Sequence, residues 1–194
     1  MNWTLLILKK AAAVSPWGAM TLAVALPLAL AGCGPALNWR NVSVPGADLN
    51  VTLPCKPDEA RRTVELAGAP TELAMIGCEA DGAMFAVSHT AITNPALVGA
   101  ALTHWRAAVI ANLGAQAAAS ASDTPFALRG ALVLPQSVRT MLQGRRPDGS
   151  MVTAQAVWFA RVSGAEVRLY HAVVYTSKPR SELADQFFAA LALP

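Results

Sequence analysis

The residue whose surroundings most directly specify chemistry is Cys33, a thiol that follows a long uncharged stretch of the chain. Two lysines give the N-terminus a positive charge, and residues 17–31 carry no charge and are mostly Ala, Leu and Val. This stretch ends in small residues directly before the thiol. A cationic start, an apolar core and a small-residue cleavage site are the parts of a secretory signal. We therefore predict that residues 1–32 form a cleavable export signal.

The tetrapeptide Leu30-Ala31-Gly32-Cys33 resembles the lipobox of bacterial lipoproteins. The resemblance implies thioether attachment of a diacylglycerol to Cys33, cleavage before this residue, and acylation of the new amine with a chain such as palmitate. Gly34 rather than Asp follows the cysteine, which by analogy with sorting rules favours the periplasmic face of the outer membrane. The alternative is a plain transmembrane anchor. However, the apolar stretch is shorter than the ~20 residues that a spanning helix needs, and Pro27 interrupts it.

Two cysteines, Cys55 and Cys78, remain once Cys33 carries lipid. An even pair in an exported, oxidising compartment predicts a disulfide, which stabilises a loop of this length by roughly 3 kcal/mol in the chain-entropy model. The alternative is two buried free thiols. We expect no metal site and no cofactor, because the three histidines are scattered singly, without ligand pairs at short spacing.

Catalytic motifs are the next possibility. The sequence contains no Gly-x-Ser-x-Gly nucleophile elbow and no phosphate-binding glycine loop. Ser88 and His89 are adjacent, but neighbouring residues on a strand point to opposite faces and cannot pair. Glu79 and Asp81 flank a turn, where acidic residues are usually solvated. We expect a protein without an active site, although a hydrolase that uses His89 or His171 remains an alternative.

The charge of the chain restricts its partners. The precursor has 15 basic and 12 acidic residues, and removal of Lys9 and Lys10 with the signal leaves 13 against 12, a formal charge of +1. We therefore expect no nucleic-acid partner. Arg61-Arg62 and Arg145-Arg146 are the densest positive positions. Both pairs are interpreted as solvated charges, with an anionic lipid or acidic partner as the alternative.

Hydropathy patterns predict one domain over residues 42–194, joined to the lipid by a tether over residues 33–41. Alternating apolar residues and turn signals predict strands in the first half and again in the second half. Expected strands cover 42–44, 49–53, 63–66, 73–79, 84–92, 128–142 (bent at Pro135), 151–162 and 167–175. Residues 95–113, which follow a cap in Thr93-Asn94-Pro95, and 177–191 are predicted helices. A polar connection is expected at 58–61 and a mobile loop at 115–125. The predicted class is α+β, an antiparallel sheet of hairpins covered by two main helices.

Three segments of the predicted domain resemble the PsbP-like fold, which a nuclear-import factor also uses. They are the opening Ala47-Asp48-Leu49-Asn50-Val51-Thr52-Leu53-Pro54, the strand Gly82-Ala83-Met84-Phe85-Ala86-Val87 after a tight turn, and the closing Phe187-Phe188-Ala189-Ala190-Leu191-Ala192-Leu193. The resemblance covers most of residues 42–193, and the cysteine pair and the Ala-rich stretch depart from it. It implies a non-enzymatic binding or assembly factor, and it supplies no catalytic residues.

Together these observations predict a membrane-tethered, non-catalytic envelope lipoprotein that acts as an interaction or assembly factor. Its expected partners are the membrane, through the lipid on Cys33, and an unidentified envelope protein, and we expect the protein to be a monomer. Two alternatives stay open: a periplasmic hydrolase with an unfamiliar site, and a carrier of a small apolar ligand. A dry pocket under the helix at 95–113 would favour the carrier, and a pocket lined by convergent histidines and acids would favour the enzyme.

Overall fold

The fold is described from a computed structural model that covers residues 36–146 and 148–194. The predicted signal, Cys33 and the first residues of the predicted tether therefore lie outside the described residues. The described helices and strands, in chain order, are β1 (Arg40–Val44), β2 (Leu49–Leu53), β3 (Asp58–Leu66), β4 (Ala69–Ala80), β5 (Ala83–Ile92), η1 (Pro95–Leu97), α1 (Val98–Asn112), α2 (Ala115–Ser120), β6 (Ser122–Pro125), β7 (Val138–Arg145), β8 (Met151–Ser163), β9 (Glu166–Thr176) and α3 (Ser181–Ala189).

Seven strands form one antiparallel sheet in the order β3-β4-β5-β9-β8-β7-β6, and β1 and β2 form a separate hairpin. Successive strands of the sheet are joined mostly as hairpins, but β5 pairs with β9, which follows much later in the chain. This pairing brings the two halves of the described chain together at the centre of the sheet. The predicted class, α+β with an antiparallel sheet built from hairpins, is confirmed.

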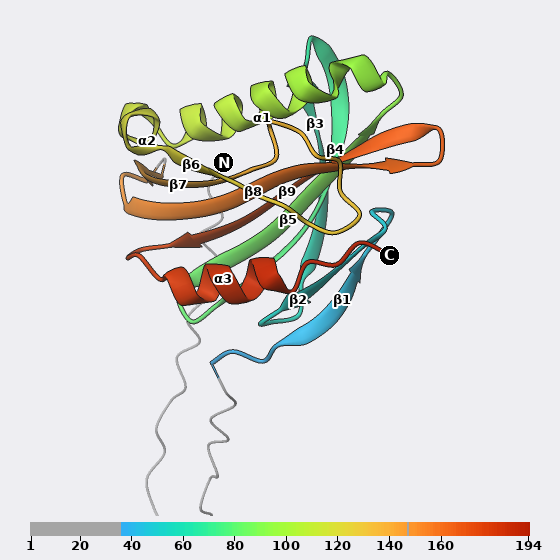
Figure 1. Cartoon of the computed structure of the whole chain (residues 1–194). Helices are drawn as coiled ribbons and strands as arrows, with labels where there is room; N and C mark the ends of the chain where they lie inside the picture. Colours follow the sequence, from blue (N-terminus) through green and yellow to red (C-terminus); the bar gives the residue numbers. More distant parts are fainter. Residues whose placement is uncertain (1–35, 147) are drawn as a thin grey trace, which may run out of the picture. The chain divides into compact units, whose positions relative to one another are not determined.

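Each face of the sheet is covered by different elements. Helix α1 lies across one face, while α3 and the β1–β2 hairpin lie against the other (Figure 1). Because side chains alternate along a strand, the central strands β8 and β9 contribute to two separate clusters of buried residues. The α1 side contains Leu102, Trp105 and Trp158, and the α3 side contains Phe85 and Phe187. Burial on both sides explains why the central strands are almost continuously apolar.

The start of α1 follows the predicted capping chemistry. The Asn94 side chain accepts a hydrogen bond from the Ala96 backbone N–H at 3.0 Å, and Pro95 occupies the first turn. A short 3₁₀ turn precedes the α-helix, which ends at Asn112. Gly114 then adopts a φ of +84°, a left-handed conformation that glycine tolerates best. The predicted helix over 95–113 is thus confirmed with a 3₁₀ first turn.

The predicted polar connection at 58–61 is wrong, because Asp58 begins β3. This strand is at the edge of the sheet and pairs only with β4. Most of its residues are exposed, so both of its faces carry charged side chains and the sequence shows no apolar alternation. Charged edge strands of this kind resist pairing with other chains. The edge position therefore explains why the hydropathy pattern missed this half of the strand.

The predicted mobile loop at 115–125 is also wrong, because it contains α2 and β6. Ala117 is fully buried against β7. The Ser120 hydroxyl accepts a hydrogen bond from the Gln143 backbone N–H at 2.9 Å. The small side chains thus allow α2 to lie close to the sheet. At Gly144, a Cβ would lie 3.2 Å from the Ala117 Cβ of α2, which shows how close this approach is.

The predicted strand over 128–142 begins only at Val138, and the residues before it form a connection without ladder pairing. Leu132 and Leu134 pack against the α1-side cluster, which accounts for the apolar run that was interpreted as a strand. A single backbone bond, Leu132 N–H to Ala160 O at 2.7 Å, ties this segment to β8. The predicted helix over 177–191 is shorter, and extends from Ser181 to Ala189.

Candidate functional site

A pocket of about 800 Å³ lies on the α1 side of the sheet, and we call it the α1 pocket. Its floor is made by four neighbouring strands, and the end of α1 adds Val109, Asn112 and Leu113 as one wall. Strand β3 contributes Asp58, Ala60 and Arg62, strand β4 contributes residues 75–79, and Cys55 and Lys56 line the pocket from the β2–β3 connection. Strands β5 and β9 contribute Met84, Ala86, Ser88, His171, Val173 and Tyr175.

The register of the strands explains why the floor is hollow. Ala86 pairs with Gly77 on one side and with Val173 on the other, so small side chains meet at the centre. A Cβ at Gly77 would lie only 2.8 Å from the Phe85 carbonyl oxygen. The close backbone approach therefore requires glycine, and this glycine also keeps the floor low. Met75 and Met84 flank the small residues with flexible apolar side chains, which adapt to ligands of different shapes.

Two buried polar residues, Ser88 and His171, line the α1 pocket. The ring of His171 stacks on Trp158, with centroids 4.8 Å apart, and meets the edge of Trp105 at 5.6 Å. Its Nε2 atom has no hydrogen-bond partner among the described residues. Burial, together with the positive charge of Arg62, lowers the pKa of His171 to about 3. The imidazole is therefore neutral at physiological pH.

Ser88 and His171 are direct cross-strand partners on β5 and β9, and both line the α1 pocket. In the sequence, Ser88 is adjacent to His89, and its pairing with His171 could not be predicted because strand register cannot be read from a single sequence. A serine beside a histidine suggests a nucleophile and a base. The unpartnered Nε2 of His171, however, accepts no proton from Ser88, and a base whose conjugate acid has a pKa of about 3 is weak near neutral pH.

Arg62 is the cationic side chain of the pocket that faces its polar residues. Burial raises the pKa of the Tyr175 phenol, and the charge of Arg62 partly offsets this effect. The same charge contributes to the lowered pKa of His171. The neighbouring Arg61 forms an ion pair with Glu72 at 2.7 Å, whereas none of the ion pairs in the described part of the chain includes Arg62.

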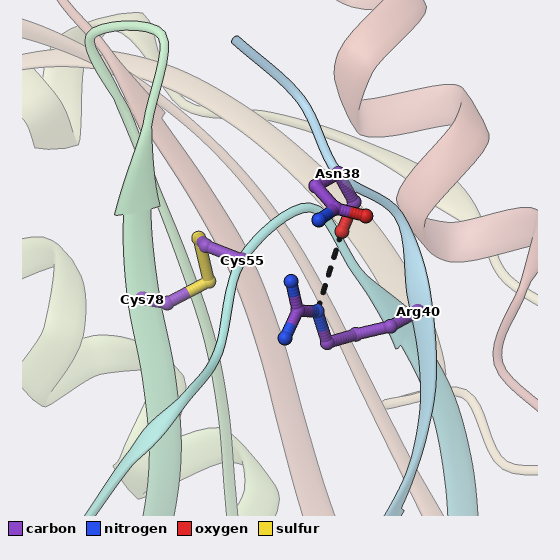
Figure 2. The surroundings of a disulfide bond; sticks show 4 residues. All are labelled: Asn38, Arg40, Cys55 and Cys78. Carbon is purple, nitrogen blue, oxygen red and sulfur yellow. Dashed lines mark hydrogen bonds between the residues drawn. A yellow bond between two sulfur atoms is a disulfide. The ribbon is translucent and has the colours of Figure 1, made fainter. Parts of the chain in front are cut away.

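The predicted disulfide is confirmed. Cys55, which follows β2, is bonded to Cys78 on β4, and their Cα atoms are 5.9 Å apart (Figure 2). Both residues also line the α1 pocket. The bond therefore fixes the β2–β3 connection to the sheet at one edge of the pocket. In the same region, the Arg40 side chain donates a weak hydrogen bond to the Asn38 carbonyl at 3.4 Å.

His89 lies away from His171, on the opposite face of the sheet. Its Nε2 is 3.1 Å from the Pro45 carbonyl oxygen, and its Nδ1 is 3.3 Å from Arg168 Nη1. These contacts define a neutral ring that donates to Pro45 and accepts from Arg168. Burial and the charge of Arg168 lower its pKa. His89 thus connects the β1–β2 turn to the sheet.

The remaining residues singled out in the sequence are separated in the structure. His104 Nδ1 accepts a hydrogen bond from the Ala67 backbone N–H at 3.2 Å. Asp81 forms an ion pair with Arg180 at 2.6 Å, while Glu79 lies at the α1 pocket. Arg145 donates to the Gly149 carbonyl oxygen at 2.7 Å. Within residues 36–146 and 148–194, no group of three or more His, Cys, Asp or Glu side chains is placed to hold a metal ion.

No family model matches the chain, and no curated protein sequence matches it. Among the described residues, no helix is both long enough and apolar enough to cross a membrane. The two features that bear on the function of this protein are the α1 pocket and the predicted lipidation at Cys33.

Proposed function

We propose that this protein is a lipid-anchored, non-catalytic binding protein of the bacterial envelope, and that it acts as an interaction or assembly factor. The α1 pocket is the proposed binding site, and it is the observation that carries the proposal. A hollow of about 800 Å³ with apolar walls and a few polar groups has the size and character of ligand sites in proteins. The residues that form it come from four strands and one helix, so the site is preorganised by the fold.

The absence of catalysis in this proposal is supported by the chemistry of the pocket. His171 is a weak base because burial and Arg62 disfavour its protonated form. The nearest charged side chain that acts on it is a cation rather than an orienting carboxylate. A serine hydrolase needs the opposite arrangement, in which a carboxylate stabilises the imidazolium. The environment of Ser88 and His171 therefore favours a binding surface.

The membrane tether in this proposal rests on the lipobox at Leu30-Ala31-Gly32-Cys33. Lipid on Cys33 would hold the domain at the periplasmic face of the outer membrane. The PsbP-like resemblance, which covers the opening segment, β5 and the end of the chain, adds the expectation of a non-enzymatic assembly role. A monomeric state is part of the same proposal.

The second candidate function is a carrier of a small apolar ligand. It is favoured by the position of the α1 pocket beneath the end of α1, and by the apolar side chains of Met75, Met84 and Leu113 that line it. The two candidates share one site and differ in the occupant. They can therefore be separated by identifying what contacts the pocket in the envelope.

The test uses a photoreactive amino acid in place of Met84, whose side chain is 37% exposed at the pocket. The matched control has the same amino acid at Val133, which is fully exposed in the connection before β7 and does not line the pocket. After illumination of intact cells, we expect adducts at position 84 and none of the same mass at position 133. An adduct with an envelope protein supports the interaction factor, and an adduct with a small molecule supports the carrier.

Blocking the pocket provides the second control. Ala60 is exposed on the edge strand and lines the pocket, so Ala60→Trp fills space with little effect on the core. We expect this substitution to abolish the adducts at position 84. Equal labelling at positions 84 and 133, or adducts that persist in Ala60→Trp, would reject the α1 pocket as the binding site.

A further inference from the structure

We propose that the α1 pocket binds a molecule with an apolar chain and a single anionic headgroup, with Arg62 as the residue that recognises the anion. This inference rests on the proposed function, because it names the chemical class of ligand for the same pocket. Its first support is that Arg62 is the arginine that lines the α1 pocket, and that none of the four ion pairs in the described part of the chain includes it.

The contrast between Arg61 and Arg62 is informative because the two residues are adjacent on β3. Side chains alternate along a strand, so they project from opposite faces. Arg61 meets Glu72 at 2.7 Å, and Arg62 lines the α1 pocket. A guanidinium presents several N–H donors in a planar fork that matches a carboxylate or a phosphate. The donors of Arg62 are thus available to a ligand at this position.

The groups around Arg62 favour a neutral or anionic polar head rather than a cation. Ser88 and Tyr175 present hydroxyls to the pocket, and burial keeps the Tyr175 phenol protonated by raising its pKa. His171 is neutral for the same reason. An anion bound by Arg62 would therefore meet a full positive charge together with neutral hydrogen-bonding groups, of which Ser88 and His171 are buried.

The rest of the pocket suits an apolar chain. Met75, Ala86 and Val173 form the floor, and Val109 and Leu113 at the end of α1 form the wall. Asp58, Glu79 and Lys56 also line the pocket, and all three are exposed. The pocket lining thus carries two acidic side chains, Asp58 and Glu79, and two basic ones, Lys56 and Arg62, so their formal charges cancel. Arg62 is exposed as well, so selection for an anion depends on which charge reaches the polar residues: the charge of Arg62 acts to lower the pKa of His171 and of Tyr175, whereas neither acid shifts these two groups.

The experiment uses the full-length chain in envelope membranes and a long-chain alkyl carboxylate that carries a photoreactive diazirine. The matched probes have the same chain with an alcohol or a monophosphate as headgroup. We expect the carboxylate or the phosphate probe to label the strands that hold Met75 and Met84, as mapped by mass spectrometry. The better-labelling anion identifies whether the source is a free acid or a phosphorylated lipid, and the alcohol should label about tenfold less.

Two variants give the decisive comparison. Arg62→Gln should lower labelling by the anionic probe about tenfold, because a charge-assisted hydrogen bond is lost. Arg61→Gln should label like the unmodified chain, because Arg61 is on the other face and its exposed ion pair contributes little to stability. Both positions are exposed, and thermal unfolding of the two variants checks that each one folds.

The inference is overturned by equal labelling by the alcohol and the anions, by unchanged labelling in Arg62→Gln, or by adducts that map outside the α1 pocket. Absence of any labelling also overturns it. Rejection of the anionic ligand class can be distinguished from rejection of the proposed binding function. If the crosslinker at position 84 captures an envelope protein while the anionic probes do not label the pocket, the binding protein stands and only the ligand class is wrong.

Discussion

Ser88 and His171 face each other across β5 and β9, on the face of the sheet that α1 covers, and His171 also stacks on Trp158. The histidine thus has a hydroxyl-bearing neighbour on one side and two indole rings around it. Burying an imidazole with an unpartnered nitrogen has a free-energy cost of about 1–3 kcal/mol. Because burial of the His171 imidazole has this cost, we infer that His171 has a role in the α1 pocket, which it lines.

The environment of His171 predicts a pH-dependent stability. Its pKa falls from 6.5 in the unfolded chain to about 3 in the folded protein, because of burial first and Arg62 second. Between these values the unfolded state binds the extra proton, so stability rises with pH and is lost as the pH falls below 6.5. The expected slope from this group is about 1.4 kcal/mol per pH unit within the window.

His171→Phe tests this prediction by removing the titrating group while keeping an aromatic ring between the two tryptophans. We expect the free energy of unfolding, measured with urea at pH 7 and pH 5, to change less with pH in the variant than in the unmodified protein. His89, whose pKa is also lowered, remains in both proteins and leaves a residual slope. The same pH dependence in both proteins would show that His171 titrates normally.

Two tyrosines on β9 provide a matched pair for stability. The Tyr170 hydroxyl donates to the Ala47 carbonyl oxygen at 2.6 Å, in the turn of the β1–β2 hairpin. Burial raises its pKa to about 12, so it remains a donor at physiological pH. Tyr170→Phe leaves the buried carbonyl without this partner, and we expect a loss of about 1 kcal/mol of unfolding free energy.

Tyr175→Phe is the control for that measurement, because the Tyr175 hydroxyl lines the α1 pocket instead of joining two elements. We expect its unfolding free energy to stay within about 0.5 kcal/mol of the unmodified protein. If the two substitutions destabilise the fold equally, then the hydrogen bond to Ala47 is not what attaches the β1–β2 hairpin to the sheet.

The disulfide predicts a third measurable effect. A double substitution of Cys55 and Cys78 by alanine removes the link between the β2–β3 connection and β4. Stabilisation by a bond that closes a loop of this size is typically about 2–4 kcal/mol. We expect a loss in that range by guanidinium unfolding, and a similar loss when the unmodified protein is reduced. A reductant should have no effect on the double variant, and an effect there would point to some other reducible feature.

The sequence allowed the strands with clear alternation and strong turns to be predicted, because both signals are local. Pro45-Gly46 and Asp81-Gly82 mark turns with positive φ, at Gly46, Asp81 and Gly82. The cysteine pair was predicted from number and compartment alone. Only the second half of β3 was predicted. The first half, from Asp58, is exposed on both faces of the edge strand and shows no apolar alternation.

The α1 pocket could not be predicted for a different reason. Each of its strands has an ordinary pattern, such as a small residue between two larger ones around Gly77 or Ala86. The hollow exists only because the register aligns these small residues with each other and His171 with Ser88. The pairing of β5 with β9 joins segments that are far apart in the chain. One sequence contains no local signal for such a pairing.

The last prediction concerns the anchor. Cys33→Ser should abolish lipidation, because an alcohol does not replace the thiol in forming the thioether. Both buried clusters of the described chain consist of residues after position 36, so the fold itself should be retained. We expect the variant to incorporate no labelled palmitate and to accumulate as an uncleaved precursor or disappear from the membrane fraction. The Cys55→Ala, Cys78→Ala double variant is the matched control, since it also lacks cysteines but should still take up the label and stay in the outer membrane. A Cys33→Ser protein that remains labelled and membrane-bound would refute the lipoprotein assignment, whatever the α1 pocket is found to bind.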